Sequence, residues 1–165
     1  MTPTSDPRSA AEAIWRAAVE RVKPGGLLRS HFDAHPELGE AIRRAPRLVV
    51  VGGGKAGSSM AASLEAILGE HLLKTEGIVN VPANGVRPLK KIRLHAARPA
   101  ASNHPTPEGV VGTRSMLDLV AGSGPEDVVL ALISGGGSAL TPCPVDSVSL
   151  EDKQAVTKLL HRCGA

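Results

Sequence analysis

Two glycine-rich segments hold the residues of this sequence with the clearest chemical potential. The first, at 52–57, reads Gly-Gly-Gly-Lys-Ala-Gly, and the second, at 134–138, reads Ser-Gly-Gly-Gly-Ser. Glycine lets a backbone approach a phosphate because no Cβ stands in the way, and N–H groups at a helix start favour an anion. We therefore predict that phosphate is bound by Gly52, Gly53, Gly54, Ser134, Gly135, Gly136, Gly137 and Ser138.

Lys55 lies inside the first glycine segment and is the candidate catalytic residue. Its charge would reinforce a site that is already electropositive, which suits a phosphate, a carboxylate or a phosphoryl group in transfer. The segment is not a Walker A loop, because the G-x-x-x-x-G-K-[ST] spacing is not met. The alternative is a solvent-exposed lysine in a tight turn.

A dinucleotide site is a weaker interpretation of the same segment. Gly52, Gly54 and Gly57 satisfy G-x-G-x-x-G, but that reading also needs an acidic residue at the end of the second strand. Val81 is instead followed by Pro-Ala-Asn, and Glu76 is expected to precede that strand. The second segment does not read G-x-S-x-G, so a serine hydrolase of the nucleophile-elbow type is poorly supported.

His104 lies in a third polar segment, Ser-Asn-His-Pro-Thr-Pro-Glu-Gly at 102–109. It either belongs to a loop facing the substrate or is hydrogen-bonded to backbone, and the residues alone favour the second reading. The other histidines show no metal-ligand spacing. Cys143 and Cys163 are the only cysteines, too few for a metal site of two pairs, and we expect free thiols although one disulfide is possible.

The elements that would position these segments alternate between strands and helices. Asp6 and Pro7 predict the start of a helix that reaches Val22 and is stopped by Lys-Pro-Gly-Gly. Continuous apolar runs at 48–51 and 127–133 predict strands buried on both faces, as in a parallel sheet, and helical spacing predicts the later helices. The strands are expected at 48–51, 77–81, 92–96 and 127–133, and the later helices at 36–44, 58–73, 108–121 and 149–163.

This alternation predicts a doubly wound, Rossmann-like α/β fold with a mostly parallel sheet, in which ligands bind where strands end and helices begin. We expect a helical segment at 1–46 and an α/β domain for nucleotide or phosphate at 47–165.

Composition excludes several classes of function. Of 165 residues, 42% are hydrophobic and 21% charged, which is ordinary for a globular domain. Only 1% are aromatic, so base-stacking platforms for single-stranded nucleic acid are missing. A net charge of +3 does not call for a nucleic-acid partner. No run of about 18 apolar residues predicts a membrane span, and no secretory signal is visible, so we expect a cytoplasmic protein acting on a small molecule.

Four segments, at 48–60, 102–109, 128–142 and 150–165, together resemble the N-terminal half of the large domain of glycerate 2-kinases. This resemblance implies transfer of a phosphoryl group from ATP, with Mg²⁺, to the 2-hydroxyl of glycerate. It implies that Lys55 is catalytic, that 134–138 contacts nucleotide phosphates, and that His104 and Asn103 lie at the substrate. Some relatives of this kind carry hydroxypyruvate reductase names.

Family members continue beyond the point where this sequence stops. The resemblance therefore implies an incomplete α/β domain, a fragment with little or no activity alone, and a missing C-terminal half as a partner chain. Two alternatives stay open: a non-catalytic phosphate- or nucleotide-binding module, and an NAD(P) enzyme resembling hydroxypyruvate reductase.

Overall fold

The computed structural model describes residues 6–164, so residues 1–5 of the expected helical segment and residue 165 lie outside it. The strands are β1 (Leu48–Gly53), β2 (Thr75–Pro82), β3 (Ile92–Arg98) and β4 (Val128–Ile133). The α-helices are α1 (Pro7–Arg21), α2 (Pro24–Ala34), α3 (Pro36–Arg44), α4 (Gly57–Leu68), α5 (Pro107–Ala121), α6 (Gly137–Leu140) and α7 (Leu150–Arg162). Two 3-10 helices are η1 (Gly69–Lys74) and η2 (Ala83–Gly85).

The four strands form one parallel sheet in the order β3-β2-β1-β4, which confirms the predicted doubly wound α/β fold. The chain moves from β1 outward to β2 and β3, and then returns to place β4 on the other side of β1. The order of strands therefore reverses between β1 and β4. In folds of this kind, that reversal opens a crevice at the carboxyl ends of the two strands.

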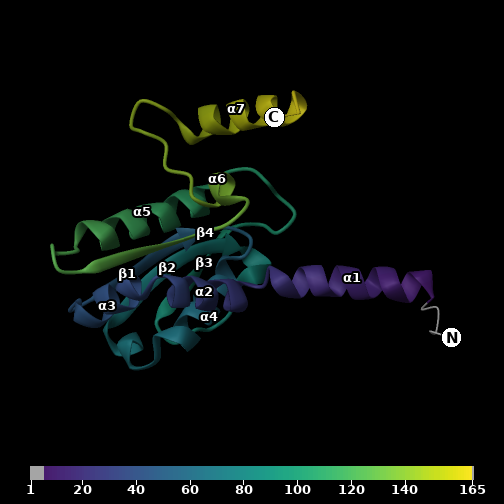
Figure 1. The fold of residues 1–165 in the computed structure, drawn as a ribbon. Coiled ribbons are helices and arrows are strands. Elements are labelled where there is room, and N and C mark those ends of the chain that lie inside the picture. The colour runs from purple at the N-terminus through teal and green to yellow at the C-terminus, as the bar shows by residue number, and fades with distance from the viewer. Residues whose placement is uncertain (1–5, 165) are drawn as a thin grey trace.

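Helices cover both faces of the sheet, with α5 on one face and α2 and α4 on the other (Figure 1). The β1 run is buried along almost its whole length, as its unbroken β-branched sequence predicts. The main core cluster lies between the sheet and α4 and contains Ile42, Leu48, Val50, Ala61, Leu64, Leu68, Leu72, Val79, Val81, Ile92, Leu94 and Leu132. It is built from aliphatic side chains alone.

The β4 strand is an edge, although its sequence is as continuously apolar as that of β1. Val129 is 42% exposed and Ile133 is 63% exposed, while Leu132 on the opposite side is buried. The α5 helix packs mainly on β3, β2 and β1. The outer face of β4 is therefore an uncovered apolar surface among the described residues.

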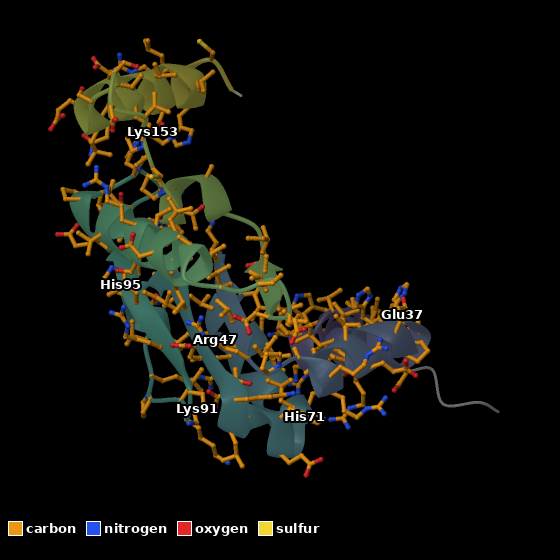
Figure 2. The ribbon with its side chains drawn as sticks, turned by 90° about the vertical axis from the view of Figure 1, so that its left-hand side faces the viewer. Glu37, Arg47, His71, Lys91, His95 and Lys153 are labelled. Carbon is orange, nitrogen blue, oxygen red and sulfur yellow. The ribbon has the colours of Figure 1, made fainter. Side chains whose placement is uncertain are left out.

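Two helices lie away from the sheet. The α1 helix extends outward from the domain and buries none of its residues, leaving Ile14 and Trp15 exposed (Figure 1). The α7 helix lies apart from the sheet in both views and also buries none of its residues (Figure 1, Figure 2). Its start follows the sequence prediction, because Ser149 and Asp152 form a capping box.

Three local predictions were wrong. No helix was predicted at 24–34, but these residues form α2. Pro24 stands in the first turn of this helix, a position where proline is favoured. The helix predicted at 58–73 ends at Leu68, where Gly69 turns the backbone with φ +55° and η1 follows. Glu76 lies inside β2 and pairs with Arg47 at the amino end of the sheet, opposite the glycine segments.

Candidate functional site

The two glycine segments lie together at the carboxyl ends of β1 and β4, where they form one hydrogen-bonded unit. The Lys55 N–H donates to the Gly135 carbonyl at 2.9 Å, and the Ala56 N–H donates to Ser134 Oγ at 3.0 Å. The Ser134 N–H donates back to the Gly53 carbonyl at 3.2 Å. Two N–H groups of the first segment are thus used to hold the second, and they are not available to a ligand.

Close contact between the segments explains the need for glycine at position 54. Gly54 has φ +146°, a conformation that other residues rarely adopt. A Cβ there would overlap Ser134 Oγ and would lie 2.7 Å from the Ser134 carbonyl oxygen. Any side chain would therefore force the two segments apart.

Asn80 ties this unit to the helices on the α5 side. Its side chain is fully buried, and Nδ2 donates to the Leu140 carbonyl at 2.7 Å and to the Gly109 carbonyl at 3.2 Å. Its backbone carbonyl accepts the Gly54 N–H at 3.2 Å. One residue of β2 therefore joins the first glycine segment, α5 and α6.

The Lys55 side chain is exposed and lies along the second glycine segment. Gly136 has φ +86°, and a Cβ there would lie 3.3 Å from both Cγ and Cε of Lys55. Glycine at 136 thus leaves room for the lysine to cross the segment. This contact brings the candidate catalytic residue against the candidate phosphate loop.

A cavity of about 350 Å³ lies beside Lys55 at the start of α4. Ser58, Ser59 and Arg87 also line it, and Arg87 donates to the Ser58 carbonyl at 3.1 Å. No side chain caps the start of α4, so first-turn N–H groups remain for an external acceptor. Two cations, two hydroxyls and a helix N-terminus make this cavity suited to an anion.

The second segment does not open a long helix. The α6 helix that follows it has only four residues, so the contribution of this segment comes from its backbone and its hydroxyls and not from a sizeable helix dipole. Ser134 already accepts from the first segment. Ser138 remains exposed and faces a different cavity.

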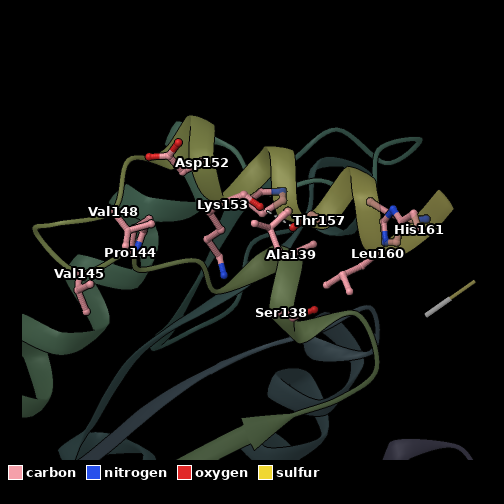
Figure 3. Close-up of a pocket in the computed structure, with 13 residues that line it drawn as sticks. Ser138, Ala139, Pro144, Val145, Val148, Asp152, Lys153, Thr157, Leu160 and His161 are labelled. Carbon is pink, nitrogen blue, oxygen red and sulfur yellow. Dashed lines mark hydrogen bonds between the residues drawn. The ribbon is translucent and has the colours of Figure 1, made fainter. Parts of the chain in front are cut away.

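That second cavity has a volume of about 550 Å³ and lies between α7 and the body of the domain. Ser138, Asn103 and His161 line it, together with apolar side chains of α7 (Figure 3). The His104 ring lies 5.3 Å from the His161 ring, and its Nδ1 is buried without a hydrogen-bond partner. The structure therefore brings Asn103, His104 and Ser138 to one side of the glycine unit and Lys55 to another.

Two carboxylates fix the elements around β3. Burial raises the pKa of Glu65, but N–H groups of Ile92, Lys91 and Lys90 outweigh it and hold that pKa below its usual value. Glu65 on α4 thereby fixes the start of β3. At the other end, hydrogen bonds from its own backbone N–H and from Thr106 lower the pKa of Glu108 at the start of α5.

Asn80 and Arg98 were not predicted as site residues, and neither was Arg87, which lines the cavity beside Lys55. Asn80 interrupts the apolar run of β2, and Arg98 ends β3 just before a proline, so each carried a faint signal. Arg98 is 2% exposed and donates to Asn103 Oδ1 at 3.3 Å. It supports the loop that carries Asn103 and His104.

Metal-ligating groups, cysteines and long apolar helices are the remaining features of the described residues that bear on function. Within residues 6–164 no group of three His, Cys, Asp or Glu side chains could hold a metal ion. Cys143 and Cys163 are both free, as expected. No helix in this part of the chain combines the length and apolarity needed to cross a bilayer.

Comparison with known proteins places this geometry in a family. Residues 10–165 match the family described as "Domain of unknown function (DUF4147)". The chain belongs to the DUF4147 family. The "Glycerate kinase" of Bos taurus is 34% identical over 94% of this chain, and the "D-glycerate 2-kinase" of Thermotoga maritima is 34% identical over 99% of it. These matches confirm the resemblance to glycerate kinases.

A solved structure agrees with the sequence matches. The crystal structure of Thermotoga maritima glycerate kinase aligns with 94% of this chain at 30% identity and a TM-score of 0.72. A "Putative hydroxypyruvate reductase" of Agrobacterium vitis is 37% identical over 96% of this chain. The DUF4147 chain spans about a third of the length of the relatives it matches, namely 32%, 36% and 33% of the three sequences and 34% of the solved chain.

Proposed function

We propose that this chain supplies the phosphate-binding part of an ATP-dependent kinase that phosphorylates the 2-hydroxyl of glycerate. The observation that carries the proposal is the contact between Lys55 and the second glycine segment at the crevice between β1 and β4. Kinase relatives imply the use of a nucleotide, and a lysine beside glycine backbone suits its phosphates. The catalytic role of Lys55 and the binding role of both segments are part of this proposal.

In the proposed reaction the substrate 2-hydroxyl oxygen forms a bond to the γ-phosphorus of ATP. The bond from that phosphorus to the β–γ bridging oxygen breaks, and the products are ADP, 2-phosphoglycerate and a proton released to solvent. Charge develops on the phosphoryl oxygens, and Lys55 would neutralise part of it, with N–H groups at the start of α4 adding to the effect. The cavity that Asn103 and Ser138 line would hold glycerate next to this centre.

The chain alone is expected to have little or no activity. Phosphoryl transfer needs charge neutralisation and positioning from several directions at once. The uncovered apolar surfaces of α1, α7 and β4 support a further layer of polypeptide at those positions. We propose that the portion present in longer relatives covers them and completes the catalytic site as a partner chain.

The reductase name of the Agrobacterium vitis relative favours a second candidate, reduction of hydroxypyruvate with NAD(P)H. The spacing of Gly52, Gly54 and Gly57 is compatible with it. However, β2 ends at Pro82 and is followed by Asn84, with no acidic side chain for a ribose. A non-catalytic nucleotide-binding module is a third candidate. Such a module would bind nucleotide but would show no turnover even after the partner chain is added.

Titration calorimetry with ATP tests the proposal on the chain, on Lys55→Ala and on Lys91→Ala, an exposed lysine remote from the crevice. We expect binding by the chain and by Lys91→Ala, and loss of about tenfold or more in Lys55→Ala, as for one charge-assisted contact. Equal ATP binding by Lys55→Ala would contradict the role of this lysine. If the chain bound NADH but not ATP, and Lys55→Ala bound NADH equally well, the reductase would be supported.

Phosphorylation of D-glycerate is then measured for the chain alone and after adding the polypeptide that corresponds to the rest of the relatives. Turnover only in the mixture supports the divided kinase. Turnover by the chain alone would contradict the expected lack of activity, and ATP binding without turnover in either sample would favour the non-catalytic module.

A further inference from the structure

Arg98 is a buried cation without an anionic partner. It lies at the carboxyl end of β3 and is 2% exposed. Its Nη1 donates to the Pro99 carbonyl at 3.1 Å and its Nη2 to Asn103 Oδ1 at 3.3 Å, so both acceptors are neutral. Its Nε is buried and has no acceptor, and no carboxylate among residues 6–164 forms an ion pair with it.

This arrangement is energetically unfavourable unless something else completes it. Burying a guanidinium removes its hydration, and neutral acceptors replace only part of that loss. The planar guanidinium group matches a carboxylate, which can accept two parallel hydrogen bonds from it. The orphaned Nε and the weak bond to Asn103 therefore indicate that an anion is the missing partner.

A second unsatisfied atom lies in the same segment. Among the described residues three buried side-chain nitrogen or oxygen atoms lack a partner, and two of them are Arg98 Nε and His104 Nδ1. Both belong to residues 98–104, which connect β3 to the turn before α5. Both atoms therefore belong to the segment that also carries Asn103, the residue that accepts from Arg98.

The adjoining cavity has the size and charge for a small organic anion. Asn103, whose Oδ1 accepts a hydrogen bond from Arg98, lines the cavity of about 550 Å³. Lys153 also lines it, and Figure 3 shows its side chain extending from α7 toward the body of the domain. Ser138 contributes a hydroxyl on the side of the glycine unit. A hydroxy acid in this cavity could thus meet Lys153, the Ser138 hydroxyl and the Asn103 side chain that covers Arg98.

We propose that Arg98 is the carboxylate-binding residue for the hydroxy-acid substrate, with the Asn103 amide holding its place until the substrate displaces it. This inference rests on the proposed function and assigns a partner to the substrate carboxylate, which does not itself react. Ser138 of the second glycine segment lines the cavity that Asn103 also lines, while Gly136 of the same segment lies against Lys55. The segment thus borders both proposed ligand positions.

Two substitutions distinguish ligand binding from a merely structural role of Arg98. Arg98→Met keeps the length of the side chain but removes the charge. Asn103→Asp is isosteric and presents a carboxylate of the chain itself to Arg98, so it satisfies the guanidinium and competes with the substrate. Arg93→Met is the matched control, because Arg93 lies on the same strand and is exposed.

The experiment measures binding of D-glycerate and, separately, of inorganic tripolyphosphate by titration calorimetry, with thermal unfolding as a check of folding. We expect Arg98→Met and Asn103→Asp to weaken D-glycerate binding by about tenfold or more, as loss of a charged hydrogen bond implies, and Arg93→Met to leave it unchanged. Asn103→Asp should also raise the unfolding temperature. Tripolyphosphate binding should depend on Lys55 and not on Arg98.

The outcomes separate this inference from the proposed function. D-glycerate binding that Asn103→Asp leaves intact would overturn the role of Arg98, because a structural arginine would only gain from that carboxylate. Tripolyphosphate binding without D-glycerate binding by the unmodified chain would also overturn it, while leaving the phosphate site standing. If the unmodified chain bound D-glycerate but not tripolyphosphate, the proposed function would be refuted instead.

Discussion

Replacing Gly54 with alanine should damage the candidate site, because it would push the two glycine segments apart. The residue has φ +146°, and its new Cβ would lie 2.7 Å from the Ser134 carbonyl oxygen and overlap Ser134 Oγ. Adopting such a φ costs about 1–3 kcal/mol, and overpacking against backbone costs about 1–3 kcal/mol. Losing the bond from Ala56 N–H to Ser134 Oγ adds about 1 kcal/mol.

Together these contributions predict that Gly54→Ala lowers the free energy of unfolding by about 3–7 kcal/mol. For a chain of this size that corresponds to a fall of roughly 6–28 °C in the unfolding temperature. Gly135→Ala is the matched control, since nothing lies within 4 Å of a Cβ at 135 and its φ is not in the restricted region. Urea unfolding followed by circular dichroism measures both variants.

Removing the Ser134 side chain tests the origin of the effect. Ser134→Gly in the Gly54→Ala background takes away the overlapping Oγ, so the double variant should recover part of the lost stability, and the two changes should not be additive. Equal stability of Gly54→Ala and Gly135→Ala would refute the reasoning, because it would mean that the two segments can separate at no cost.

Three further predictions concern other parts of the fold. Asn80→Asp should destabilise the chain by about 3–5 kcal/mol in urea unfolding, because a buried charge would face the Leu140 carbonyl. Asn84→Asp, at an exposed position, should change the free energy of unfolding by less than about 0.5 kcal/mol. Equal effects of the two substitutions would contradict the role given to Asn80. The lowered pKa of Glu65 means that its stabilising contribution is present above its unfolded pKa and is lost as the pH falls through the folded pKa. The stability difference between the chain and Glu65→Gln, measured by urea unfolding, should therefore shrink as the pH falls below about 5, and a constant difference would argue against it. Val129→Lys on the exposed face of β4 should keep the unfolding temperature within a few degrees and reduce self-association measured by light scattering. Leu132→Lys on the buried face should prevent folding. Unchanged light scattering by Val129→Lys would show that the exposed face does not mediate association.

Much of the sheet could be predicted because its signals are local. All four strands were predicted, β1 and β4 from unbroken apolar runs and β2 and β3 from shorter segments, and the glycine segments that follow β1 and β4 indicated the crevice. The α2 helix was missed because proline followed by two glycines usually ends structure, whereas here the proline begins the next helix. The exposure of β4 was equally hidden, since the sequence of a strand does not tell which neighbours cover it.

The site was predictable in its backbone and less so in its side chains. Glycine runs after two strands indicated where a ligand would bind, but they could not tell that Lys55 and Ala56 would give their N–H groups to the second segment. The importance of Asn80 and Arg98 depends on burial created by elements far away in the chain. Local patterns carry no information about such burial, so these residues emerge only from the fold.

The hydrogen bonds between the two glycine segments also constrain the order in which the chain can fold. They join residues 53–56 to residues 134–135, so the whole of β2, β3 and α5 lies within the loop that they close. Such contacts form only after much chain entropy has been lost, and they contribute little to an early folding nucleus. The crevice should therefore be among the last features to form, and a nascent chain would gain affinity for phosphate only once β4 has docked beside β1.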